Sequence, residues 1–151
     1  MGSGVVGSDV MGSGRETVRA AVDELLAESA WALDQKDYAA YLNFFTEDAT
    51  YEVGGRVLRG RADIAGRFTD REGERTTRHL YSGLRLASIG GGVWAAESVW
   101  LTFAGDGTPP MDRIDPYQVA DFRDEVIQDG STWRIRARVI RSVFREPSLA
   151  P

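Results

Sequence analysis

The spacing of apolar side chains changes once along the chain, and this change limits the folds that the chain can adopt. Between residues 18 and 33, apolar or small side chains recur every three or four positions, which is the period of a helix with one buried face. Ser13 is a candidate N-cap, with Glu16 three residues further on as in a capping box. A second, short helix, capped by Asp37, is expected over residues 38–45. The first helical face consists of Val18, Val22, Leu25, Leu26, Ser29, Ala30 and Leu33.

After residue 48 the period falls to two, which is the period of a strand with one buried face. Gly54 and Gly55 separate two short segments of this kind and can take the positive φ that a tight hairpin turn needs. A third short helix is expected over residues 61–68. Helices followed by a run of antiparallel strands are typical of an α+β fold, with the helices packed on one face of a curved sheet. The expected strands are 49–53, 56–58, 76–88, 93–103, 116–128 and 132–143.

The length of 151 residues fits a single domain. Residues 1–13 are rich in Gly and Ser and lack an amphipathic period, so we expect a flexible tail there, one domain over residues 14–146 and a short C-terminal tail over 147–151. No apolar run approaches the ~20 residues of a membrane span, and no signal-peptide pattern opens the chain. The cytoplasm is therefore the expected location.

Composition excludes several kinds of chemistry. The chain has no Cys and a single His, so thiol nucleophiles, zinc–thiolate sites and a histidine metal cage cannot be built. Its net charge of -5 disfavours nucleic acid as a partner, because phosphate contacts need a positive surface. No GxGxxG, Walker or GxSxG motif is present, so no cofactor is expected. General acid–base chemistry remains, because it needs only a few titratable groups in a dry pocket.

The single histidine, His79, is the candidate general base. An imidazole has an unperturbed pKa of about 6.5, which lies near neutral pH. A lone histidine on a strand is nevertheless more often a structural or surface residue, and that alternative stays open at this point. On its expected strand, period-two parity places Leu80, Leu84 and Leu86 on one face and His79, Tyr81 and Gly83 on the other.

Asp34 is the second candidate, because it stands at the expected end of the first helix among large apolar residues. The macrodipole gives a helix C-terminus partial negative charge, so a carboxylate there is disfavoured and calls for a reason. Orienting an imidazole would be one reason. An ordinary turn between helices would be another, since Asp is common in turns.

The last expected strand alternates cleanly, with three arginines on one side. Such a row is compatible with an anion site. The more common arrangement is a solvated or subunit-contact face that pairs with acidic residues on the neighbouring strand. The arginines are Arg134, Arg136 and Arg138, the opposite side carries Trp133, Ile135, Ala137 and Val139, and the acids are Asp121, Asp124 and Glu125.

Several segments resemble SnoaL-like proteins of the nuclear transport factor 2-like superfamily. These segments are residues 32–38 (ALDQKDY), 44–51 (FFTEDATY), 59–64 (RGRADI), 77–80 (TRHL) and 133–135 (WRI). Together the resemblance covers residues 15–145, and the order and spacing of the segments make it specific. It implies a cone-shaped fold, in which a strongly bent mixed sheet wraps around N-terminal helices and encloses one apolar pocket.

Within that superfamily the chain is most similar to the branch that holds scytalone dehydratase, hexachlorocyclohexane dehydrochlorinase and small subunits of aromatic-ring dioxygenases. The first two enzymes use an Asp–His dyad whose positions match Asp34 and His79. Tyr51 falls where scytalone dehydratase has a tyrosine that helps to hold water against the substrate carbonyl. A second pocket histidine of that enzyme is matched here by Glu97 or Ser98. The resemblance therefore implies the dyad and no particular substrate.

The function implied by this resemblance is that of a cofactor-free lyase or isomerase, of dehydratase or cyclase type, acting on a small apolar, aromatic or polyketide-like molecule. Two alternatives are the structural small subunit of an aromatic-ring-hydroxylating dioxygenase and a non-catalytic ligand-binding module. An exposed apolar sheet face is usually covered by a partner, so a homodimer or homotrimer is expected. The expected pocket residues are Trp31, Tyr38, Tyr81, Ser98 and Trp100, beside the catalytic candidates Asp34, His79 and Tyr51.

Overall fold

The computed structural model describes residues 8–69 and 74–149, and its elements follow the change in apolar spacing. Helices occupy the first part of the chain and long strands the rest, so the fold is α+β as expected. Residues 147–149 of the expected C-terminal tail form a 3₁₀ turn, whereas residues 150 and 151 lie outside the described residues. The elements are α1 (Ser8–Asp34), α2 (Tyr38–Asn43), β1 (Phe45–Val53), β2 (Arg56–Arg59), α3 (Gly60–Thr69), β3 (Arg75–Gly90), β4 (Val93–Asp106), β5 (Pro116–Asp129) and β6 (Thr132–Arg145).

The long helix α1 buries the apolar face that its sequence predicts, with Val22 and Leu26 fully buried. It begins at Ser8 rather than at the expected cap Ser13, so residues 8–13 of the expected tail are helical. A helix that has nucleated gains one hydrogen bond for each residue it adds, and it can therefore continue past its amphipathic part. Residues 1–7 of that tail lie outside the described residues. Asp37 caps α2 as expected, because its Oδ1 accepts a hydrogen bond from the Ala40 N–H at 3.0 Å.

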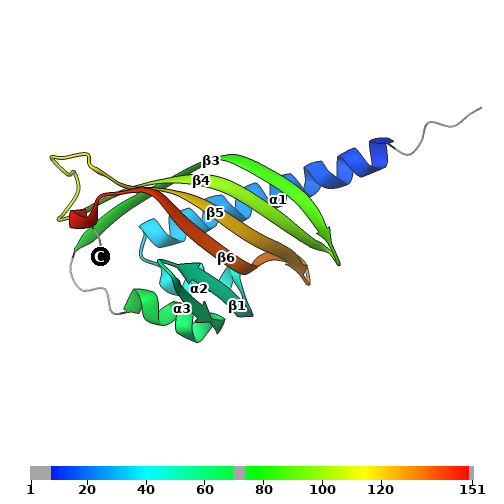
Figure 1. Ribbon diagram of the computed structural model, residues 1–151, viewed down its shortest axis with the longest axis horizontal. Coiled ribbons are helices and arrows are strands. Elements are labelled where there is room, and N and C mark those ends of the chain that lie inside the picture. The colour runs from blue at the N-terminus through cyan, green and yellow to red at the C-terminus, as the bar shows by residue number, and fades with distance from the viewer. Residues whose placement is uncertain (1–7, 70–73, 150–151) are drawn as a thin grey trace, which may run out of the picture.

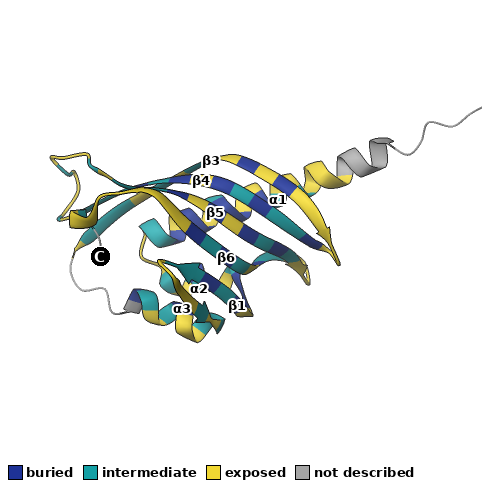
Figure 2. Ribbon diagram, viewed as in Figure 1, coloured by how far each residue is buried: buried dark blue, intermediate teal, exposed yellow. Residues whose placement is uncertain are grey.

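The strands form one mixed sheet in the order β2-β1-β6-β5-β4-β3. Every neighbouring pair is antiparallel except β1 and β6, which run parallel and join the N-terminal elements to the end of the chain. Figure 1 shows the long strands β3–β6 bending together over α1, with α2 and α3 beside β1. The sheet does not close into a barrel, because β2 and β3 remain its edges. Burial is concentrated where the sheet faces the helices (Figure 2).

A β-bulge in β3 changes which side chains reach the core. The pairing of β3 with β4 shifts between Ser82 and Arg85, and Gly83 between them has a φ of 67°, in the left-handed region that favours glycine. Leu84 is consequently buried on the helix side, although Leu80 faces outward and is 54% exposed. The expectation that Leu80, Leu84 and Leu86 share one face is therefore wrong, because period-two parity does not continue through a bulge.

A second bulge, in β6, has the same effect on the row of arginines. The pairing of β6 with β5 shifts between Glu125 and Val126, opposite Ala137 and Ile135. Arg138 is therefore turned inward and is 1% exposed. Arg136 stays on the outer face, where its Nε lies 2.7 Å from the Glu125 carboxylate. The expected arrangement of three arginines on one face is thus wrong for Arg138, while the expected pairing with acids of the neighbouring strand is present.

Inside the core, Arg138 forms an ion pair with Asp124, and both side chains are fully buried. Arg138 Nε and Nη2 donate to the two carboxylate oxygens at 2.7 and 2.8 Å, and Nη1 donates to the Tyr41 hydroxyl at 3.1 Å. The guanidinium carbon lies 5.0 Å from the centre of the Phe122 ring and 5.5 Å from that of Phe45. Burial by itself lowers the pKa of Arg138, but the neighbouring Asp124 carboxylate, together with Tyr41 and Tyr51, more than offsets this effect and raises that pKa. The guanidinium therefore stays charged inside the core.

Removing one member of this pair is expected to destabilise the protein strongly. Arg138→Met leaves the Asp124 carboxylate buried without its partner, so the free energy of unfolding should fall by about 3–5 kcal/mol. Adding Asp124→Leu should recover most of this loss, because no buried charge then remains. Urea unfolding followed by circular dichroism measures these changes. Arg136→Met, which breaks the exposed pair with Glu125, serves as the control at less than about 1 kcal/mol. An Arg138→Met loss no larger than that of the control would contradict the role of the pair.

Candidate active site

Asp34, the last residue of α1, holds the start of β3 through three hydrogen bonds. Its Oδ1 accepts from the Thr77 hydroxyl at 2.9 Å and from His79 Nδ1 at 2.7 Å, and its Oδ2 accepts from the His79 backbone N–H at 3.0 Å. The side chain is only 5% exposed, so these donors replace the water that a buried carboxylate loses. They also offset the unfavourable position of a negative charge at the C-terminus of a helix.

The bond to Asp34 fixes the orientation of the His79 imidazole. A carboxylate only accepts hydrogen bonds, so the neutral ring carries its proton on Nδ1 and keeps a lone pair on Nε2. The His79 side chain is 17% exposed and lies edge-on to Trp100, with 6.3 Å between the ring centres. The structure thus brings together the two residues that the resemblance pairs. The arrangement is that of a base whose orientation is set by a carboxylate.

A cavity of about 150 Å³ lies inside the cone, and His79 is part of its wall. Tyr38 and Tyr51, two of the residues expected at the site, line this cavity together with Tyr41. Burial, reinforced by the neighbouring Tyr51, raises the pKa of the Tyr41 phenol, which therefore stays protonated. The cavity wall is thus rich in aromatic rings and hydroxyl groups. It also includes Lys36, Arg67, Phe68, Arg75, Thr102, Tyr117 and Phe122.

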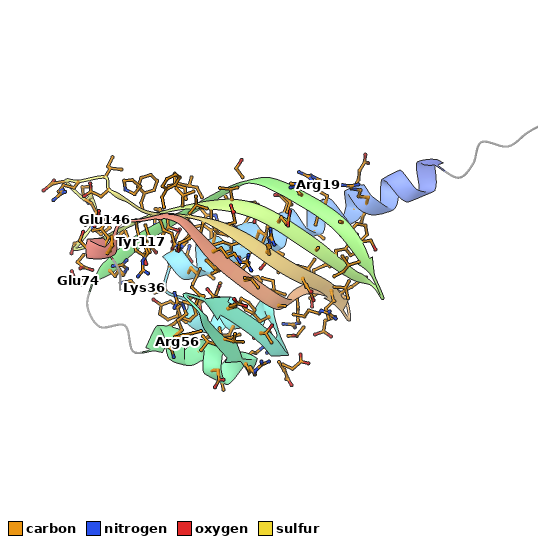
Figure 3. All side chains as sticks on the ribbon, viewed as in Figure 1. Arg19, Lys36, Arg56, Glu74, Tyr117 and Glu146 are labelled. Atoms are coloured by element: carbon orange, nitrogen blue, oxygen red, sulfur yellow. The ribbon has the colours of Figure 1, made fainter. Side chains whose placement is uncertain are left out.

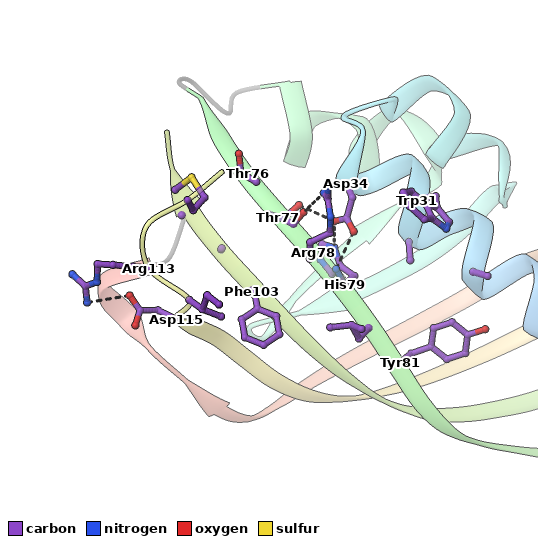
Figure 4. A pocket seen from close by; sticks show the side chains of 17 residues that line it. Trp31, Asp34, Thr76, Thr77, Arg78, His79, Tyr81, Phe103, Arg113 and Asp115 are labelled. Atoms are coloured by element: carbon purple, nitrogen blue, oxygen red, sulfur yellow. Dashed lines mark hydrogen bonds and ion pairs between the residues drawn. The ribbon is translucent and has the colours of Figure 1, made fainter. Parts of the chain in front are cut away.

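A larger groove of about 740 Å³ runs along β3 beside α1 (Figure 4). Thr77 and His79 line both the groove and the inner cavity, whereas Asp34 lines the groove alone. Trp31 and Tyr81, two further expected pocket residues, line the groove and not the cavity. The rest of its lining is mainly apolar and includes Leu80, Phe103, Met111 and Ile114.

The hydroxyl of Tyr81 is engaged in a structural contact with α1. It lies 2.8 Å from a carboxylate oxygen of Asp23 and 2.9 Å from the carbonyl oxygen of the same residue. Burial and then this hydrogen bond raise the pKa of Tyr81 well above its ordinary value. Tyr81 is therefore held as a neutral hydrogen-bond donor to Asp23.

Ser98 and Trp100 line neither space, so their expected place in the pocket is wrong. Both residues are buried, and the Trp100 indole donates a hydrogen bond to the Ser98 hydroxyl at 2.9 Å. The indole also stacks on Phe122 and Tyr81, with ring centres 4.6 and 5.1 Å away. β4 is a middle strand of the sheet, and the side chains on its inward face pack closely against their neighbours. Ser98 and Trp100 therefore have almost no exposed surface.

Several residues at the site are not singled out by the sequence analysis. Thr77 lies two positions before His79 on the same face of β3, so period-two parity was a sufficient signal for it. Tyr41 is predicted on the apolar side of α2, but nothing in its spacing distinguishes a cavity tyrosine from a core tyrosine. The guanidinium groups of Arg67 and Arg75 come from α3 and β3, and only the folded chain brings them to the same wall.

Within residues 8–69 and 74–149, no group of three or more His, Asp or Glu side chains is arranged to hold a metal ion. The site offers instead an oriented imidazole and several hydrogen-bond donors. In the same part of the chain, no helix combines the length and the apolar character needed to span a membrane.

Residues 15–139 match the model of the SnoaL-like domain family, and the chain therefore belongs to this family. The match covers most of the chain and includes both members of the dyad. It agrees with the family that the sequence motifs indicate. A comparison with curated protein sequences gives no significant match.

Several solved structures share the fold at low sequence identity. ActVI-ORFA from Streptomyces coelicolor is 19% identical, with a TM-score of 0.76 over 84% of this chain and 98% of that chain. A candidate scytalone dehydratase from Novosphingobium aromaticivorans is 16% identical, with a TM-score of 0.76 over 87% and 88%. The β subunit of a candidate aromatic-ring-hydroxylating dioxygenase from the same organism is 19% identical, with a TM-score of 0.75 over 87% and 93%. The fold is that of the nuclear transport factor 2-like superfamily, as expected.

Because the chain has one histidine, NMR can observe the dyad directly. In neutral His79, Nδ1 is expected to carry the proton and Nε2 to be unprotonated, since Asp34 accepts only from Nδ1–H. Asp34→Ala should produce a mixture of tautomers, because that acceptor is removed. Long-range ¹H–¹⁵N correlation spectra of labelled protein distinguish the two forms. Arg85→Ala, an exposed change on the same strand, should keep the wild-type spectrum. A wild-type ring protonated on Nε2 alone would contradict the hydrogen bond.

Proposed function

We propose that the protein is a cofactor-free lyase or isomerase, of dehydratase or cyclase type, that acts on an aromatic or polyketide-like small molecule. The observation that carries this proposal is the 2.7 Å hydrogen bond that Asp34 accepts from His79, a residue in the wall of an aromatic-lined cavity. The SnoaL-like family and the similarity to a candidate scytalone dehydratase support it.

In the proposed mechanism, His79 Nε2 removes a proton from a substrate carbon next to a carbonyl group. Asp34 keeps Nε2 as the accepting nitrogen, and its negative charge stabilises the imidazolium that forms. A positioned base of this kind contributes roughly 10²–10⁴-fold to a rate. The side chain of Asp34 is nearly inaccessible to solvent, so its charge acts on the imidazole with little screening.

Removal of the proton leaves an enolate, whose oxygen needs a hydrogen-bond donor. Tyr51 lines the same cavity as His79 and is 4% exposed, so we assign it this role, directly or through a water molecule. In an elimination, the imidazolium then returns the proton to the departing hydroxyl, and one water molecule leaves. In an isomerisation or ring closure, the proton returns to carbon or oxygen of the substrate. The same three residues therefore serve each of these outcomes.

Exchange of carbon-bound hydrogen in D₂O tests the shared first step without knowledge of the natural substrate. Wild-type protein should accelerate deuterium uptake beside the carbonyl of 1-indanone or 1-tetralone, because both ketones carry an acidic C–H beside a carbonyl that is conjugated with an aromatic ring. His79→Ala should lower the rate by about 10²-fold or more, since the base is absent. Asp34→Asn should also lower it, because an amide cannot compensate the charge on imidazolium. Mass spectrometry of the recovered ketone measures the uptake.

Arg85→Ala is the matched control for this assay, because Arg85 lies on the same strand but is exposed and paired with Glu97. Circular dichroism shows whether each variant is folded. A folded His79→Ala protein with wild-type exchange rates would exclude the proposed base. That result would leave the non-catalytic binding module or the structural dioxygenase subunit as the function of the fold.

We propose in addition that the chain assembles as a homodimer or homotrimer. Large apolar side chains of the outer sheet face, including Leu80 and Val99, are about half exposed, and a partner would cover them. Light scattering should give a mass of two or three chains. Leu80→Asp combined with Val99→Asp should shift the mass to one chain while circular dichroism stays unchanged. A wild-type monomer at micromolar concentration would contradict the assembly.

A further inference from the structure

The charged side chains that line the inner cavity are all cationic. Among the described residues of its wall, Lys36, Arg67 and Arg75 carry charge, and no Asp or Glu is present. The chain as a whole is acidic, with 23 Asp and Glu against 18 Lys and Arg. The wall, with three basic groups and no acidic one, therefore has a charge opposite in sign to the net charge of the chain.

Arg67, in the last turn of α3, has a buried nitrogen atom without a hydrogen-bond partner among the described residues. This atom, Nε, is inaccessible to solvent. The guanidinium carbon lies 5.9 Å from the centre of the Tyr51 ring, so the group is held beside the proposed catalytic tyrosine. A buried donor without a partner is destabilising, so a ligand atom that accepts from it would be stabilising at this position.

Arg75 and Lys36 belong to the same wall. The Arg75 guanidinium carbon lies 5.4 Å from the centre of the Tyr117 ring, and its Nη2 donates to the Leu149 carbonyl. Lys36 follows α1 directly, with a φ of 60°. Within the described residues, neither side chain forms an ion pair. The two cations therefore lack protein carboxylates to neutralise them.

Glu74 and Glu146 lie at the same end of the molecule as Lys36 and Tyr117 (Figure 3), and like Asp34 they have other partners. Asp34 is saturated by its three donors from Thr77 and His79. Glu74 accepts from the Thr108 hydroxyl at 3.0 Å, and Glu146 accepts from the Ser148 N–H and hydroxyl, which lower its pKa. Neither glutamate lines the cavity. A negative charge at the cationic wall must therefore come from outside these residues.

We infer that the cavity binds an aromatic carboxylate, with the ring among the tyrosines and the carboxylate at Arg67 and Arg75. Guanidinium groups match a carboxylate with two parallel N–H donors, and such charge-assisted bonds are the strong ones. A cavity near 150 Å³ is large enough for a benzene ring, so a one-ring acid fits its size. This inference rests on the proposed function in one respect, namely that the cavity is the reaction site. It goes further by specifying that the aromatic substrate carries a carboxylate.

Calorimetric titration with benzoate and with its neutral isostere benzamide tests the inference. The wild-type protein should bind benzoate at least about tenfold more tightly, because the amide cannot form charge-assisted bonds with the guanidinium groups. Arg67→Gln should abolish this preference, whereas Arg67→Lys should retain part of it. Arg85→Gln removes an exposed arginine outside the cavity and should bind both ligands as the wild type does.

His79→Ala separates this inference from the proposed function. A preference for benzoate that persists in His79→Ala belongs to the arginines and not to a protonated imidazole, whatever the exchange assay shows. Equal affinities of the wild type for benzoate and benzamide would overturn the inference, as would the absence of benzoate binding at millimolar concentration. A preference lost in His79→Ala but kept in folded Arg67→Gln would overturn it too. In each of these cases the catalytic role of the dyad is decided separately, by the deuterium-exchange assay.

Discussion

The carboxylate of Asp34 joins the N-terminal helix α1 to strand β3 of the sheet. It ends a helix at a point where the macrodipole opposes negative charge, and three donors from β3 make that position favourable. One of those donors is a backbone N–H of an edge strand, which has no further strand to bond on that side. The bonds that attach the helix to the sheet therefore also orient the imidazole. Any change that moves α1 along β3 also moves the proposed base.

Aromatic packing and one buried ion pair shape the other side of the cavity. Arg138 and Asp124 carry full charges in a dry core, and the Tyr41 hydroxyl takes one of the remaining guanidinium donors. Tyr41 in turn packs edge-on against Phe45 and Phe68, with 5.2 Å between the ring centres in both cases. The orientation of this tyrosine in the cavity wall is therefore determined by charge on one side and by ring contacts on the other.

The sequence is sufficient to predict the elements and the contact between Asp34 and His79, but not the face on which every strand residue lies. Apolar periodicity located the helices and hairpins, and the family motifs paired Asp34 with His79. Period-two alternation predicts the wrong face for Leu84 and for Arg138, because each lies beyond a bulge. A bulge depends on the register between two strands, and the apolar spacing within one strand does not reveal it. Ser98 and Trp100 were misplaced because an inward-facing residue on a middle strand can line a cavity or fill the core. Only the packing around it decides between the two.

The parallel pairing of β1 with β6 has a consequence for the way the chain folds. Thr50 pairs with Ala137, so β1 gains its second neighbour only when the last strand is available. During synthesis, the helices and the β1–β2 hairpin emerge first, but the wall that they share with β6 cannot form until β6 itself has emerged. Contacts between segments so distant in sequence require a large loop to close and slow the folding of small domains. The part of the cavity wall formed by Val53 and Ile140, which pair across β1 and β6, therefore depends on this long-range contact.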